Sequence, residues 1–117
     1  GYRIVQIIED GGLYSEELKD LLHLYLDPMI AANIDYLVLG CTHYPYLTPI
    51  LKNILPPNVT IIDSGVAVAN RTLKILKDNK LLKTDTLIGN AEFYTNKNKK
   101  ILQGFINGFG IAKKIDF

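Results

Sequence analysis

The chain contains one cysteine, Cys41, which stands two residues before His43, one of only two histidines, in the string LVLGCTHYP at residues 37–45. A thiol does chemistry as a thiolate, and a nearby histidine or the amides at the start of a helix favour that form. A lone cysteine is also commonly a small buried hydrophobe, and a histidine can equally cap a helix or face water. The pattern therefore leaves two interpretations open for Cys41, a poised proton-transfer thiol and a structural one.

Cys41 and His43 do not form a familiar metal-binding pattern. A zinc site needs further cysteine or histidine ligands at characteristic spacing, and this sequence has only His23 besides them. His23 falls on the polar face of an expected helix, together with Lys19 and Asp20. We therefore expect a solvated His23 and no metal site.

Short β-rich apolar runs alternate with longer helical periods along the chain, which predicts strands and helices in turn. Strands are expected over residues 4–8, 36–39, 59–62, 93–94 and 111–115, and helices over residues 16–26, 46–55, 66–79 and 97–107. An alternation of this kind is typical of a parallel sheet with flanking helices. The predicted fold class is therefore α/β.

Helix ends are also visible in the sequence. Ser15 is expected to cap the first helix, Pro28 to kink or restart it, Ser64 to cap the helix at residues 66–79, and Gly108 or Gly110 to close the last. The first helix carries one apolar stripe, made of Leu18, Leu21, Leu22, Tyr25 and Leu26.

Polar groups follow the first three expected strands, at residues 9–12 (EDGG), 40–43 (GCTH) and 63–65 (DSG). In parallel sheets, ligands gather outside the carboxyl ends of the strands. We therefore expect these three groups to approach a single site. On residue type alone, Glu9 could equally be a solvated turn carboxylate.

Composition excludes several classes of protein. The 117 residues are 48% hydrophobic and carry a net charge of +1, with 3 basic and 8 acidic residues up to position 70 and 10 basic and 4 acidic after it. The later basic residues include Lys97, Lys99 and Lys100, which we interpret as solvated helix lysines because no aromatic residues interleave with them. No segment resembles a membrane span or a secretory signal, and one cysteine cannot form an internal disulfide. We expect a cytoplasmic protein that binds neither nucleic acid nor membrane.

The segment IDYLVLGCTHYPYLTPILKNILPPNVTIIDSGVAVANRTLKIL, residues 34–76, resembles the second half of the glutamate racemases within the cofactor-independent aspartate/glutamate racemase family. The string LGCTHYP is highly specific to that family. The resemblance continues in VQIIEDGG before it and in EFYTNKNKKILQGFINGFGIAKKIDF after it. It implies part of a two-lobed fold, in which residues 1–90 form the second half of the lobe with the CTH loop. Residues 91–117 would form a strand-helix-strand segment that packs on the first lobe.

The resemblance also implies a reaction. Members interconvert L- and D-glutamate for peptidoglycan synthesis with two cysteines, one on each face of the α-carbon, and with no pyridoxal phosphate or metal. Cys41 matches the second thiol, which acts as base toward L-glutamate and as acid toward D-glutamate. Thr42 and His43 would bind the substrate, while His43 also adjusts the protonation of the thiol and Glu9 assists. Asp63 and Ser64 match a segment that we interpret as structural.

The chain departs from the family by lacking its first half, including the DSG-x-GG loop, the PYG-type loop and the ACNT-type segment that bears the first cysteine. We therefore expect a portion of a racemase that is inactive alone, with the N-terminal half as its partner and homo-oligomerisation as a second outcome. Two alternatives remain: a racemase for aspartate or another amino acid, and a non-catalytic binding or assembly module. Apolar residues near the end are expected to lack cover, namely Ile101, Leu102, Phe105, Ile106 and Phe109.

Overall fold

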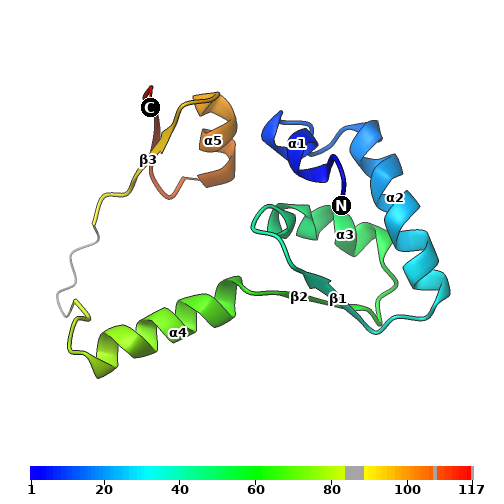
Figure 1. Ribbon diagram of the computed structural model, residues 1–117, viewed down its shortest axis with the longest axis horizontal. Helices are drawn as coiled ribbons and strands as arrows, with labels where there is room; N and C mark the ends of the chain where they lie inside the picture. The colour runs from blue at the N-terminus through cyan, green and yellow to red at the C-terminus, as the bar shows by residue number, and fades with distance from the viewer. Residues whose placement is uncertain (84–88, 107, 117) are drawn as a thin grey trace.

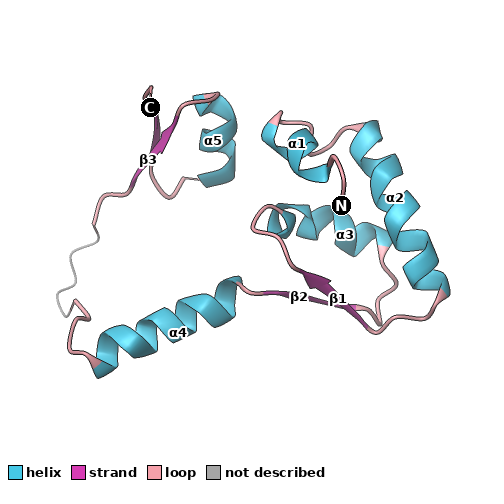
Figure 2. Ribbon diagram, in the orientation of Figure 1, coloured by secondary structure: helices cyan, strands magenta, loops and turns pink. Residues whose placement is uncertain are grey.

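A computed structural model describes residues 1–83, 89–106 and 108–116. The strands form two separate two-stranded parallel sheets, β1–β2 and β3–β4, with helices beside them (Figure 2). This arrangement confirms the predicted α/β class with parallel pairing. The elements are α1 (Ile4–Glu9), α2 (Glu16–Ala31), β1 (Tyr36–Leu39), the 3-10 helix η1 (Tyr44–Leu47), α3 (Thr48–Ile54), β2 (Thr60–Asp63), α4 (Gly65–Asp78), β3 (Glu92–Thr95), α5 (Lys99–Ile106) and β4 (Ile111–Lys114).

Helix α2 begins where the sequence predicts. The Ser15 side chain accepts a hydrogen bond from the Leu18 amide at 3.2 Å, which satisfies one of the free amides of the first turn. The helix does not restart at Pro28 but continues to Ala31, and the Ala32 amide still bonds to the Pro28 carbonyl. Proline at this position removes one amide donor, and the following turn keeps the helix continuous.

The predicted strand at residues 4–8 is wrong, because this segment forms helix α1. Its β-branched residues favour a strand by propensity, but Ile4, Ile7 and Ile8 are spaced as one helical face and all three are buried. That face packs toward α2 and joins the core. Tertiary burial has therefore overridden local propensity here.

The main core lies between α1, α2, α3 and the inner face of the β1–β2 sheet (Figure 1). Its ten buried residues all come from residues 4–55. Leu37 and Leu39 of β1 and Ile61 of β2 face it, whereas Tyr36, Val38 and Ile62 on the opposite face of the sheet are exposed. The sheet is therefore covered on one face only among the described residues.

Helix α4 leaves the end of β2 and runs away from α1, α2 and α3 (Figure 1). The prediction that the Ser64 side chain caps this helix is wrong: Ser64 makes no capping hydrogen bond, and the Gly65 amide donates to Asp63 Oδ1 at 2.7 Å instead. None of the described residues of α4 is buried. The Cα radius of gyration is 17.6 Å, against about 13 Å for a compact chain of this length, which reflects this open arrangement.

Strands β3 and β4 and helix α5 form a small C-terminal unit. Gly108, at φ 85°, closes α5 as predicted, with the Phe109 amide bonded to the Ile106 carbonyl; residue 107 of the predicted helix lies outside the described residues. Phe109 is 81% exposed, as expected for an uncovered face, but that expectation is wrong for Ile106, which is buried. Phe105 stacks on Tyr46, with ring centroids 4.5 Å apart, and so joins this unit to the N-terminal region.

No helix among the residues that the structure describes is long and apolar enough to span a membrane.

Candidate active site

Cys41 lies in the short loop between β1 and η1, and Gly40 separates it from the last residue of the strand. The loop turns tightly, with the Tyr44 amide bonded to the Cys41 carbonyl at 3.1 Å and the Tyr46 amide to the His43 carbonyl at 3.3 Å. Cys41 is half-buried, and its Sγ atom lies 3.9 Å from His43 Nδ1. The thiol and the imidazole are therefore within the range of a weak sulfur hydrogen bond.

Glu9 reaches the same loop from the end of α1. Its Oε1 atom lies 3.1 Å from His43 Nε2, and each of the two side chains is 31% exposed. The thiol, imidazole and carboxylate thus lie in one row. When Nε2–H donates to Glu9, Nδ1 is left as the acceptor that faces the thiol, which is the arrangement a carboxylate imposes on a histidine beside a nucleophile.

Lys97 completes the row, and the sequence analysis did not identify it as a site residue. It lies in the turn between β3 and α5, with Nζ 2.6 Å from Glu9 Oε2. The Lys97 ammonium, followed by the hydrogen bond from His43, holds the pKa of Glu9 below its ordinary value, and Glu9 raises the pKa of Lys97. Because 88 positions separate the two residues, no local pattern could have joined them.

Tyr44 is the aromatic neighbour of this loop. Partial burial raises the pKa of its phenol, and the nearby Cys41 and Tyr25 raise it further. Since a phenol already has a pKa near 10, Tyr44 stays neutral through the physiological range. It adds no charge beside the thiol.

Thr42 is exposed, and its hydroxyl lies 3.5 Å from His43 Nδ1, so it stands at the open side of the loop. The third predicted group does not join the others by any described hydrogen bond. Asp63 lies opposite Leu39 in the sheet register and holds the Gly65 amide at the start of α4. Two of the three predicted strand-end groups therefore meet, and the third is structural.

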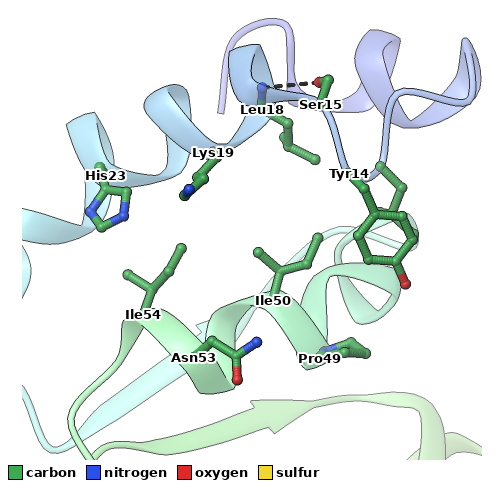
Figure 3. A pocket seen from close by; sticks show the side chains of 10 residues that line it. Tyr14, Ser15, Leu18, Lys19, His23, Pro49, Ile50, Asn53 and Ile54 are labelled. Carbon is green, nitrogen blue, oxygen red and sulfur yellow. Dashed lines mark hydrogen bonds between the residues drawn. The ribbon is translucent and has the colours of Figure 1, made fainter.

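A cavity of about 160 Å³ opens beside this row, lined by Glu9, His43 and residues of the β3–α5 turn that include Lys97. A larger cavity of about 410 Å³ lies between α2 and α3, lined partly by Lys19, His23 and Asn53 (Figure 3). His23 there pairs with Asp27 at 3.1 Å and is 45% exposed, as its predicted solvated position implies. The second cavity contains none of the thiol row.

No family model matches the sequence. Curated relatives named glutamate racemase are 41% identical in Pseudomonas syringae pv. tomato over 82% of this chain and 36% of the relative, and 42% identical in Pseudomonas putida strain GB-1 over 86% and 37%. A relative of the same name from Herpetosiphon aurantiacus is 40% identical over 80% and 37%. The chain thus spans a little over a third of the length of the curated relatives it matches.

The fold is similar to that of a solved glutamate racemase isoform from Bacillus anthracis, with a TM-score of 0.73 and 24% identity over 98% of this chain and 44% of that one. At that identity, the similarity concerns the fold alone. Any match over 100 of the 117 residues must include the LGCTHYP region, so the sequence similarity extends to it. The structural similarity covers nearly every described element. Over this shared region, the chain is similar in sequence to the curated glutamate racemases.

Proposed function

We propose that this chain supplies one of the two proton-transfer faces of a glutamate racemase, with Cys41 as the base that removes the α-proton of L-glutamate. The observation that carries the proposal is the row formed by Cys41, His43 and Glu9 in a chain whose curated relatives bear that name. Half-buried Cys41 has the imidazole of His43 beside it as a base, and Glu9 contacts the far side of that imidazole. These are features that a proton-transfer cysteine needs.

The proposed step transfers one proton. The Cys41 thiolate takes the α-proton, so an S–H bond forms as the C–H bond breaks, and the electron pair spreads into the substrate carboxylate. An acid on the opposite face then returns a proton to the carbon and inverts it. Because an amino-acid α-proton is very weakly acidic, the thiolate must be aligned in advance and shielded from water. No pyridoxal phosphate or metal takes part in this scheme.

The neighbouring residues have distinct proposed roles. Thr42, exposed at the mouth of the loop, binds the substrate carboxylate or amine through its hydroxyl or amide. His43 contacts the substrate and exchanges the proton of the thiol, from which its Nδ1 is 3.9 Å away. Glu9 orients the His43 ring through Nε2.

The opposite face requires a second thiol, and these 117 residues contain one cysteine. We infer that the other thiol belongs to a first lobe, with residues 1–90 forming part of the Cys41 lobe and residues 91–117 packing on the first. Taken alone, the chain should not racemise glutamate. The complete activity would supply D-glutamate for peptidoglycan in the cytoplasm. Self-association of the chain would cover the apolar residues that otherwise pack on the first lobe.

The test is proton NMR of L-glutamate in deuterated buffer with the chain, a Cys41→Ala variant, and a His23→Ala variant as the matched histidine control. We expect the α-proton signal to decay with the unmodified chain and His23→Ala but not with Cys41→Ala, and no D-glutamate to accumulate. Accumulation of D-glutamate would contradict the one-face proposal. Equal decay with Cys41→Ala would remove Cys41 from the reaction.

Two other functions have their own discriminators. A racemase for aspartate would exchange the α-proton of aspartate faster than that of glutamate in the same experiment. A non-catalytic binding or assembly module would show neither exchange nor a thiol more reactive than that of an unfolded peptide. The row of Glu9, His43 and Cys41 favours the glutamate racemase proposal over the module, because a module needs no imidazole held against its thiol.

A further inference from the structure

Four side chains from three separate parts of the chain lie in one continuous row. Lys97 Nζ is 2.6 Å from Glu9 Oε2, Glu9 Oε1 is 3.1 Å from His43 Nε2, and His43 Nδ1 is 3.9 Å from Cys41 Sγ. Each inner member of the row contacts one neighbour on each side. A charge at one end can therefore act on the other end through two intermediate groups.

Lys97 is brought to Glu9 by the backbone and by packing. Its amide donates to Thr95 Oγ1 at 3.1 Å, which shapes the turn between β3 and α5. The unit that carries this turn is held against the N-terminal region by the stack of Phe105 on Tyr46. The position of Lys97 is thus a property of the fold, although 67% of its side chain is exposed.

We propose that Lys97 is a positioning residue for the Cys41 thiol, acting through Glu9 and His43. The inference rests on the proposed role of Cys41 as a proton-transfer group. Lys97 engages one oxygen of Glu9 and offsets its charge, so the other oxygen holds a proton on His43 less strongly. The charge of Glu9 then acts less on His43, whose Nδ1 faces the thiol at 3.9 Å.

The other titratable groups around the row do not replace Lys97. Asp10 lies near enough to raise the pKa of Lys97 slightly, and it also accepts a hydrogen bond from Gln6 at 2.9 Å. Tyr44 adjoins the thiol loop, and burial, with Cys41 and Tyr25 nearby, raises the pKa of its phenol. Among the described residues of the row and its neighbours, Lys97 is the cation that contacts Glu9.

Removing Lys97 leaves the Glu9 charge without its offset. His43 would then hold its proton more often, and an imidazolium 3.9 Å from Sγ stabilises the thiolate more than the more distant carboxylate destabilises it. The thiolate fraction at neutral pH should therefore rise. Since the exposed Lys97–Glu9 pair is partly screened by solvent, we expect about a twofold effect rather than a large one.

The readout is the rate at which iodoacetamide alkylates Cys41, the only thiol of the chain, measured across pH. We expect Lys97→Gln to raise this rate about twofold near neutral pH, because a larger thiolate fraction reacts faster. Lys97→Arg should restore the original profile. Lys99→Gln is the matched control. Lys99 lies two positions after Lys97, at the start of α5, and forms no ion pair with any described residue.

A double-mutant cycle separates this role from general destabilisation. If Lys97 acts through Glu9, Lys97→Gln should cause no further change in a Glu9→Gln background. An unchanged rate in Lys97→Gln, or the same change with and without Glu9, would overturn the proposal. If Lys97→Gln does not fold by circular dichroism, raising salt to about 0.5 M on the unmodified chain screens the same pair and should raise the rate in its place.

The alkylation assay contains no glutamate. A failure of the Lys97 proposal is therefore distinct from a failure of α-proton exchange, which tests the proposed function itself.

Discussion

Helix α2 buries Leu18, Leu22 and Leu26, whereas helix α4, of similar length, buries none of its residues. Both helices have apolar side chains at helical spacing. On α4, Val66 is 71% exposed, and Leu73 41% exposed. The same sequence pattern therefore ends in a core in one region and on an open surface in the other.

The difference lies in what each helix can pack against. Helix α2 has α1, α3 and the inner face of the β1–β2 sheet beside it, and these supply the rest of the ten-residue core. Helix α4 leads away from that layer (Figure 1), and the outer face of the same sheet also remains exposed. An apolar stripe specifies which face of a helix is suited to burial, but not whether another element packs against that face.

The largest expected effect separates the two helices directly. Leu18→Ala, at a side chain that is 1% exposed, should lower the free energy of unfolding by about 2 to 5 kcal/mol, because it leaves a cavity in the core. Leu73→Ala on α4 is the matched control and should change it by less than about 0.5 kcal/mol. Urea unfolding followed by circular dichroism measures both. A comparable loss in Leu73→Ala would mean that α4 is covered in solution.

The next effect concerns how the two helices begin. Ser15→Ala should cost about 1 kcal/mol, because the Leu18 amide loses its side-chain acceptor at 3.2 Å. Ser64→Ala should be nearly neutral, since the amide at the start of α4 is held by Asp63 and not by Ser64. Thermal unfolding of the two variants in parallel gives the comparison. Equal losses would show that Ser64 caps α4 in solution.

The smallest effect lies where the core region meets the C-terminal unit. The pKa of Glu9 is lowered in the folded chain, so its pairing with Lys97 stabilises the fold above the ordinary carboxyl pKa, and that contribution is lost as pH falls through the lower folded value. The window therefore lies below about pH 4.5. Urea unfolding midpoints should fall less steeply over this range in Lys97→Gln than in the unmodified chain. Identical slopes would show that the pair is not formed in solution.

Local sequence chemistry was a good guide to several elements and brought attention to two residues of the candidate site. The strand at residues 36–39, the Ser15 cap and the Gly108 helix end were predicted from residue types whose effects are local. Cys41 and His43 were found because they are two residues apart on one loop. Glu9 was named through the family resemblance, and residue type alone did not distinguish it from a solvated turn carboxylate.

The errors share a physical cause. Residues 4–8 were predicted as a strand because β-branched side chains dominate them, yet packing against α2 made them a helix. Lys97 was interpreted as a solvated lysine because no aromatic residues interleave with it, and its side chain is 67% exposed, but its ion pair with Glu9 was not foreseen. Both depend on residues that are distant in sequence, and burial and charge pairing between such residues are decided only when the chain has folded.

The amino-acid sequence by itself determined the alternation of helices and strands after residue 15, the thiol-histidine loop and the family resemblance, because each depends on neighbouring residues or on a specific string. The tertiary structure alone decided that Glu9 contacts His43, that Lys97 pairs with Glu9, and that α2 is covered while α4 is not. These outcomes depend on which surfaces meet, and the spacing of residues along a chain does not contain that information.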